Sequence, residues 1–134
     1  MTRVYDLDER LINFAVLIIK LSEKLPKTMA GNHISGQMLR SGTSPALHYG
    51  EAQAAESSND FIHKMKVGLK ELRETFSALR IVKKLNWLKP EDIDPALDEN
   101  NQLIAIFVAS VTTAKKNNKK QVGSVFKILT SLFH

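Results

Sequence analysis

Apolar residues recur at three- and four-residue steps along four segments of the chain, which is the spacing of one face of an α-helix. The segments run from about Leu11 to Leu25, from about Asn32 to Glu56, from about Ser57 to Asn86 and from about Asp94 to Lys116. No segment shows the strict alternation that is typical of a half-buried strand. Long helices with short connections favour antiparallel neighbours, so the pattern predicts an all-α fold, an antiparallel up-down four-helix bundle.

The first segment is apolar on two sides. Its main row consists of Leu11, Phe14, Ala15, Ile18, Leu21 and Leu25. A second row, about 100° further round, holds Ile12, Val16 and Ile19, so only a narrow polar strip remains. A helix that is apolar on two sides needs two partners, and in a small bundle a second subunit can supply the other. We therefore predict that Ile12, Val16 and Ile19 form an oligomer interface.

Two short motifs predict where helices begin. The hydroxyl of Ser57 can accept a hydrogen bond from a first-turn N–H, and Asp60 occupies the capping-box position. Asp94 followed by Pro95 has the pattern of an N-cap and a first-turn proline, which predicts that the fourth helix opens there.

The second segment contains the unusual stretch LRSGTSPALHYGEAQ, from Leu39 to Gln53. It carries Ser41, Gly42, Thr43, Ser44, Pro45 and Gly50. Three structures are consistent with it: a break between two helices, an active-site loop, or a bend in one long helix. We favour the bend, because no nucleophile–base pair surrounds the stretch and the bundle needs one long helix here. Pro45 frees the carbonyl of Ser41, and a neighbouring hydroxyl can help to satisfy the loosened turn.

The C-terminal residues differ from the rest of the chain. We expect a bundle domain over residues 1–116, followed over residues 117–134 by a basic linker, NNKKQVGS, and a short amphipathic helix. The apolar positions of that helix are Val122, Val125, Phe126, Leu129, Leu132 and Phe133. Docking on the bundle or on another subunit is the favoured role, and a membrane-surface segment or a partner-binding helix are the alternatives.

Composition excludes several classes of site. The chain has no cysteine, so it forms no disulfide, thiolate metal site or catalytic thiol. The N-terminal residues lack the apolar run of a signal peptide, and no stretch of ~18 apolar residues is available to span a membrane. We expect a cytoplasmic protein that does not associate with membranes.

The net charge of +5 comes from one region. Five lysines lie in the C-terminal part, where no acid occurs from residue 115 onward: Lys115, Lys116, Lys119, Lys120 and Lys127. Without them, 14 Lys and Arg balance 14 Asp and Glu. Any function that depends on positive charge must therefore be argued from a local cluster.

Candidate catalytic chemistry is sparse. None of the four histidines follows a glutamate by three residues, as the di-metal sites of helical bundles require. His48 and Glu51 give the reverse spacing once, which is more typical of a hydrogen-bonded pair than of a ligand set. No nucleophile elbow or glycine-rich phosphate loop is present. We expect no enzymatic activity, no cofactor and no metal.

A row of basic residues follows one side of the third segment: Lys66, Lys70, Arg73, Arg80 and Lys84, with Ser77 in the gap. The row contains no acid; Glu71 and Glu74 lie beside it and are expected to pair with cations three or four residues away on the same helix. One interpretation is an ordinary charged surface. The other is a site for nucleic-acid phosphates, to which Lys115, Lys116, Lys119 and Lys120 contribute. Few aromatic residues are available for base stacking, so such binding would be electrostatic and weakly sequence-selective.

These features together resemble one family, the 23S rRNA intervening-sequence proteins. The resemblance covers about residues 5–117 and includes LINFAVLIIKLSEKLP, KELRETFSALRIVKKLNWL and QLIAIFVASVTTAKKN. The specific part is HISGQMLRSGTSPALHYGEAQAAESSNDFIHKM, with the pattern Arg-Ser-Gly-x-Ser-Pro-Ala-x-x-x-x-Glu. The positions that carry the signature are Arg40, Ser41, Gly42, Pro45 and Glu51.

The resemblance implies a four-helix bundle without an assigned activity. The fold is similar to that of the accessory protein of diversity-generating retroelements, a pentameric barrel that binds nucleic acid through a basic surface and contacts a reverse transcriptase. For this chain it implies a homo-oligomer, with a pentamer favoured, that binds RNA or DNA, and it implies a protein partner such as a reverse transcriptase. The alternative is an adaptor or scaffold whose partner docks on the C-terminal segment or on an apolar face of the bundle.

Overall fold

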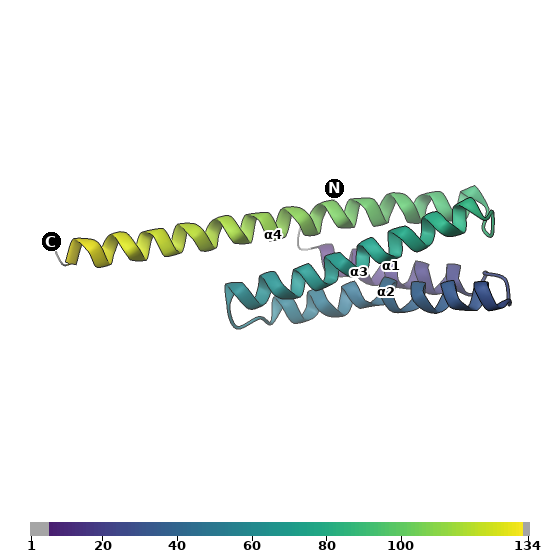
Figure 1. Ribbon diagram of the computed structural model, residues 1–134, viewed down its shortest axis with the longest axis horizontal. Helices are drawn as coiled ribbons and strands as arrows, with labels where there is room; N and C mark the ends of the chain where they lie inside the picture. Colours follow the sequence, from purple (N-terminus) through teal and green to yellow (C-terminus); the bar gives the residue numbers. More distant parts are fainter. Residues whose placement is uncertain (1–5, 133–134) are drawn as a thin grey trace.

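The computed structural model describes residues 6–132, with side chains for residues 6–119. In that range it contains four α-helices and no strand: α1 (Leu7–Ser22), α2 (Met29–Gln53), α3 (Ser58–Lys84) and α4 (Pro90–Leu132). Consecutive helices run in opposite directions (Figure 1). The predicted all-α, up-down four-helix bundle is therefore confirmed.

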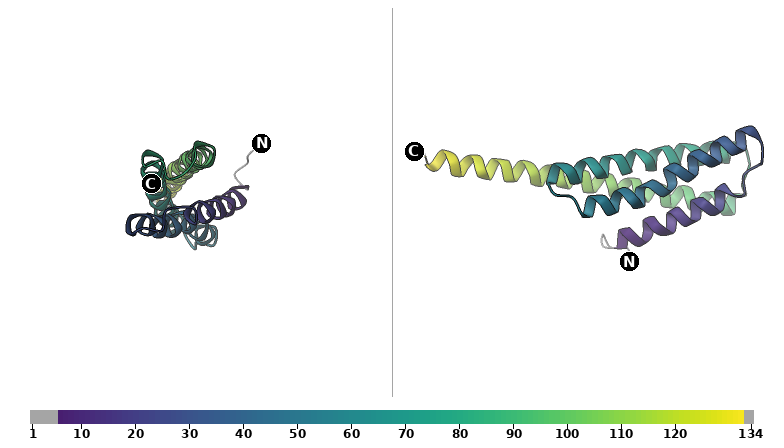
Figure 2. Two further views of the ribbon diagram at one scale, coloured as in Figure 1. Left: turned by 90° about the vertical axis from the view of Figure 1, so that its right-hand side faces the viewer. Right: turned by 90° about the horizontal axis from the view of Figure 1, so that it is seen from below.

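Contacts between the helices are uneven. α2 packs along α1 and α3, and α3 packs along α4, whereas α1 contacts α4 much less extensively. The end-on view in Figure 2 shows the four helices around one interior. The largest fully buried side chains include Phe14 of α1, Met38 of α2, Leu72 of α3 and Phe107 of α4, so every helix contributes to one core.

The two apolar rows of α1 have different environments. Leu11, Phe14 and Ile18 of the main row are at most 1% exposed. Ile12 and Val16 are each 44% exposed and Ile19 is 37% exposed, so the second row points away from the bundle. The helix is therefore apolar on two sides, and the residues that the structure describes cover one of them.

Two glycines allow close approach between helices. A Cβ at Gly42 of α2 would lie 2.6 Å from Cγ2 of Ile18 in α1, and a Cβ at Gly68 of α3 would lie 2.7 Å from Cε2 of Phe107 in α4. Because real Cβ atoms do not approach other atoms so closely, a larger residue at either position would require its neighbour to shift.

Side-chain caps begin α2 and α3. The Thr28 hydroxyl accepts from the Gly31 N–H at 3.1 Å, so α2 begins a few residues earlier than predicted. Ser57 accepts from the Asp60 N–H at 3.0 Å, as predicted. Each contact satisfies one of the backbone donors that the first turn of a helix leaves without a partner.

The predicted start of α4 at Asp94–Pro95 is wrong. α4 begins at Pro90, where the Lys89 carbonyl accepts from the N–H groups of Asp92 and Ile93. A proline at the first helical position loses no hydrogen bond, so Pro90 suits the start as well as Pro95 does. The carboxylate of Asp94 binds Nζ of Lys83 at 2.7 Å.

The predicted linker after residue 116 is also wrong, because α4 continues without interruption to Leu132. Its C-terminal part extends past the ends of the other three helices (Figure 1). Lysine and glutamine are good helix formers and one glycine costs only about 1 kcal/mol, so the polar run does not stop the helix. The side chains of the predicted amphipathic helix lie outside the described residues, and so do Phe133 and His134.

None of the helices in the described range has an apolar window of the length and hydropathy that a membrane crossing requires.

Candidate nucleic-acid interface

The predicted basic row lies along the outer side of α3. All five of its cations are exposed: Lys66, Lys70, Arg73, Arg80 and Lys84. At a rise of 1.5 Å per residue, the row is about 27 Å long. No ion pair to any of the five is formed by the residues whose side chains the structure describes. The row is therefore available to an external anion.

Lys115 of α4 lies beside Lys66, at one end of this row. Lys66 lowers the pKa of Lys115 from its ordinary value. The larger effect is a hydrogen bond from Lys66 to the neutral amine of Lys115, and the next is repulsion between the two positive charges. Burial of Lys115 and the charge of Lys119 lower this pKa by smaller amounts. Lys116 and Lys119 are exposed on the same helix, and the side chain of Lys120 lies outside the described residues. Residues 49 positions apart in the chain thus share one cluster of positive charge.

Arg80 and Lys84 lie at the opposite end of the row. They are about 21 and 27 Å from Lys66 along the α3 axis, so they do not join the lysine cluster. We call the five α3 cations together with Lys115, Lys116 and Lys119 the basic face. It has a dense end, where α3 and α4 both contribute, and a sparse end, which α3 forms alone.

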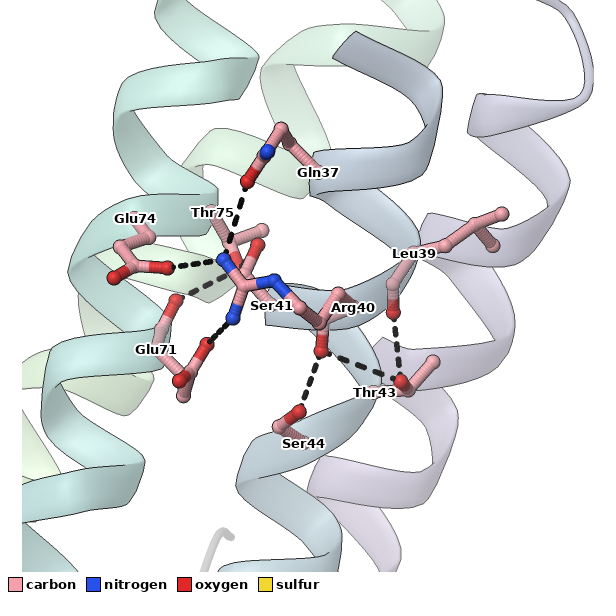
Figure 3. A network of polar contacts seen from close by, with 9 residues as sticks. All are labelled: Gln37, Leu39, Arg40, Ser41, Thr43, Ser44, Glu71, Glu74 and Thr75. Atoms are coloured by element: carbon pink, nitrogen blue, oxygen red, sulfur yellow. Dashed lines mark hydrogen bonds and ion pairs between the residues drawn. The ribbon is translucent and has the colours of Figure 1, made fainter. Parts of the chain in front are cut away.

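Arg40 joins α2 to α3 beside the basic face. Its guanidinium donates to Oε2 of Glu71 at 2.9 Å, to Oε2 of Glu74 at 2.7 Å and to Oε1 of Gln37 at 3.1 Å (Figure 3). Hydrogen bonding to Glu74 is the largest of the effects that raise the pKa of Arg40, followed by the charge of Glu71. One cation of α2 therefore binds two carboxylates of α3.

The predicted pairing of Glu71 and Glu74 within α3 is wrong. Both carboxylates bind Arg40 of α2 instead. Glu71 has no Lys or Arg three or four residues away on its own helix. Glu74 has Lys70 four residues before it on the same helix. However, the planar guanidinium of Arg40 binds Glu71 and Glu74 at the same time, whereas the ammonium group of a lysine offers only a point charge.

A buried pair of hydroxyls lies under this ion cluster. The hydroxyls of Ser41 and Thr75 are 2.8 Å apart, and Thr75 also donates to the Glu71 carbonyl at 2.9 Å. Ser41 is 1% exposed and Thr75 is 0% exposed. Because a buried hydroxyl without a partner is costly, this pair fixes how α2 sits against α3.

The stretch around Pro45 is neither a break nor a loop, because α2 is one helix from Met29 to Gln53. The hydroxyl of Thr43 donates to the Leu39 carbonyl and that of Ser44 donates to the Arg40 carbonyl, each at 2.6 Å (Figure 3). Both hydroxyls bind carbonyls four residues back, in the turn that precedes the proline. Neither of these bonds is to the Ser41 carbonyl, which Pro45 leaves without its helical donor.

Glu51, the last signature position, also contacts α3. Its Oε2 lies 3.0 Å from Nζ of Lys64 and 4.0 Å from Nδ1 of His48. Lys64, by hydrogen bonding and then by charge, lowers the pKa of Glu51, and Glu51 raises that of Lys64 in the same way. In the described part of the chain, no group of three or more His, Asp or Glu side chains is placed to hold a metal ion.

The signature residues therefore have packing roles. Arg40, Ser41 and Glu51 each contact α3, Gly42 approaches α1, and Pro45 is buried in α2. None of them lies in the basic row. Sequence reasoning missed the partners of Arg40, since they lie 31 and 34 residues further along the chain, beyond the reach of helical periodicity.

The fold and the described surface define an all-α bundle with a basic face on α3 and α4 and an exposed apolar row on α1. Residues 5–109 match the family model described as 23S rRNA-intervening sequence protein. That match spans most of the chain, and the protein belongs to this family. The C-terminal part of α4 lies beyond the matched residues.

A solved structure supports the same relationship. The crystal structure of a protein of unknown function from the S23 ribosomal protein family of Bacteroides thetaiotaomicron is similar, with a TM-score of 0.73 and 28% sequence identity. The similarity covers 78% of this chain and 97% of that chain. The comparison with curated proteins found no match.

Proposed function

We propose that this protein is a non-enzymatic helical bundle that forms a ring-like homo-oligomer, with a pentamer favoured, and binds RNA or DNA without sequence selectivity through its basic face. The observation that supports nucleic-acid binding best is the row of α3 cations that form no ion pair within the described residues. A phosphate backbone supplies closely spaced negative charges along such a row.

The chemistry of the basic face favours backbone contacts over base recognition. None of the aromatic side chains that the structure describes is exposed, so no stacking platform accompanies the cations. Each cation that neutralises a phosphate releases condensed counterions, which makes the affinity fall as salt is raised. The proposed binding therefore depends on salt and not on base sequence.

The exposed row of α1 supports the assembly part of the proposal. Ile12, Val16 and Ile19 form an apolar strip on the outer side of α1, and burial of such a strip favours association. A ring would repeat the basic face once per subunit. Several weak phosphate contacts would then act together on one nucleic acid.

The nucleic-acid proposal can be tested by titrating labelled duplex RNA with the protein at salt concentrations from about 50 to about 200 mM. The variant K66Q/K70Q/R73Q removes three charges from the basic face. The matched control K20Q/K27Q/K89Q removes three exposed lysines elsewhere. We expect the first variant to lower the slope of log affinity against log salt by about two to three and the control to change it much less.

Two results would contradict this proposal. One is affinity of the wild-type protein that stays flat as salt is raised. The other is an equal loss of affinity in the two triple variants, because binding would then follow net charge and not the basic face.

Light scattering tests the assembly proposal. We expect a mass several times the 15.0 kDa of one chain, and five times that mass for a pentamer. Val16→Asp places a charge in the exposed row and should return the 15.0 kDa species. Leu47→Asp is the matched control, since Leu47 is 68% exposed on α2 and lies outside the row. A wild-type monomer, or equal dissociation by both variants, would refute the proposed interface.

A second candidate function is that of an adaptor whose protein partner, such as a reverse transcriptase by family analogy, docks on the C-terminal part of α4. The observation that favours it is the extension of α4 past the other helices (Figure 1). Truncation after Lys116 separates the roles. If the protein is an adaptor, the truncated variant should lose its partner in a pull-down and keep its oligomeric mass. If the truncated variant instead loses its oligomeric mass, the C-terminal part of α4 belongs to the oligomer interface.

A further inference from the structure

We infer that Arg40 is a positioning residue for nucleic-acid binding: it holds the carboxylates of Glu71 and Glu74 on the α2 side of α3, which leaves the cations of the basic face free for phosphate. This inference rests on the proposed function. It concerns a residue outside the basic face that would control how much positive charge the face presents.

The positions of the two acids explain why they need to be held. Glu74 lies four residues after Lys70, which is the spacing at which a carboxylate and an ammonium pair on a free helix. Glu74 also lines one hollow together with Lys70, Arg73 and Ser77, so its carboxylate borders the basic face directly. Without another partner, Glu74 would neutralise Lys70 or Arg73.

The observed contacts resolve this competition in favour of Arg40. Glu74 binds Arg40 at 2.7 Å and Glu71 binds it at 2.9 Å, and neither acid pairs with Lys70 or Arg73 among the described side chains. Glu74 also borders a second hollow, on the α2 side, that is lined by Arg40 and Ser41. The carboxylate of Glu74 thus stands between Arg40 on one side and Lys70 and Arg73 on the other, and it is bound by Arg40.

The chemistry of arginine suits this role. Its planar fork can bind two carboxylates at once, whereas a lysine at the same position offers a point charge at the end of a flexible stem. A guanidinium keeps its charge at neutral pH, so it stays available to bind both carboxylates. Gln37 binds the same guanidinium at 3.1 Å and helps to fix its orientation.

The test compares Arg40→Gln with a matched variant, Arg10→Gln. Arg10 of α1 also binds a carboxylate, Glu99 of α4, at 3.1 Å, on elements that do not carry the α3 row. Both substitutions remove one positive charge, but R10Q releases one acid away from the basic face, whereas R40Q releases two acids beside it. We expect R40Q to weaken duplex-RNA binding more than R10Q does. We also expect R40Q to lower the slope of log affinity against log salt by about one, which is the effect of losing one phosphate contact.

A rescue variant separates charge from folding. In R40Q/E71Q/E74Q the released carboxylates are absent, so affinity and salt slope should return at least to the wild-type values. Thermal unfolding of each variant shows whether the bundle is intact. If the fold is intact and the triple variant stays weak, Arg40 would itself contact the phosphates and the inference would be overturned.

The outcomes also distinguish this inference from the proposed function. If the wild-type protein binds RNA and R40Q binds it as R10Q does, the inference fails and the proposed function stands. If the wild-type protein binds no RNA, the proposed function fails. In that case a crystal structure of R40Q still tests the competition, since Glu74 should turn toward Lys70 or Arg73, and an unmoved Glu74 would overturn the inference.

Discussion

Both sides of α3 carry polar residues, but the two sides differ in what those residues bind. On the side that faces α2, Glu71, Glu74 and Thr75 all have partners in Arg40 or Ser41. On the outer side, the five α3 cations of the basic face have no ion-pair partner among the described residues. Polar groups on one side hold the bundle together, and those on the other are left for an external ligand.

This difference predicts that substitutions on the two sides have separate effects. The largest effect on stability is expected from Thr75→Val on the α2 side, which leaves the Ser41 hydroxyl buried without its partner. The cost should be about 1 to 3 kcal/mol of unfolding free energy, measured by urea denaturation. RNA affinity should stay at the wild-type value, because Thr75 is 0% exposed.

Two controls sharpen this prediction. Thr112→Val makes the same change at an exposed position of α4 and should alter stability by no more than about 0.5 kcal/mol. Lys70→Gln on the outer side should also stay within about 0.5 kcal/mol while lowering RNA affinity. If T75V and T112V had equal stability, the hydroxyl pair would not hold α2 against α3.

A smaller effect is expected at the pair of Glu51 and Lys64, which also joins α2 to α3. Lys64 lowers the pKa of Glu51 below its ordinary value of 4.5. A carboxyl whose folded pKa is lowered stabilises the protein above its unfolded pKa, and that contribution is lost as pH falls through the folded pKa. Unfolding of wild type and Glu51→Gln should therefore differ most near neutral pH and converge in acid, and a constant difference would contradict the pairing.

The smallest effect is expected on the outer side, at Lys115. Its pKa is lowered by Lys66, so Lys66→Gln should raise the pKa of Lys115 toward 10.5, as measured by NMR titration. The repulsion is present while Lys115 is charged and disappears as pH rises through its lowered pKa, so K66Q should add slight stability at neutral pH and none in strong base. An unchanged pKa of Lys115 would show that the two ammonium groups are not neighbours in solution.

Several features of this protein could be predicted from local sequence. The recurrence of apolar residues predicted four helices, and Ser57 predicted the first turn of α3. The two-sided apolar character of α1 and the exposure of the α3 cations follow from helical periodicity alone. The start of α4 and the linker after residue 116 were mispredicted, because two prolines fit a helix start and a polar run does not by itself end a helix.

The partners of Arg40, Ser41 and Glu51 could not be predicted in the same way. Each binds a residue of α3 that lies between 13 and 34 positions away in the chain. Periodicity tells which side of a helix a residue occupies, but it does not tell which residue of another helix lies opposite. That depends on how α2 and α3 are aligned, which is fixed by the packing of the core.

The sequence by itself determined the helices, their buried sides and the row of cations, because these follow from interactions within a few residues of each other. Tertiary structure alone decided which charges from different helices lie close together: it brought Arg40 to Glu71 and Glu74, and it placed Lys115 beside Lys66. The physical reason is that two charges on the same exposed helix attract each other only weakly in water. A charged side chain therefore pairs with the residue of another helix that core packing holds at hydrogen-bond distance.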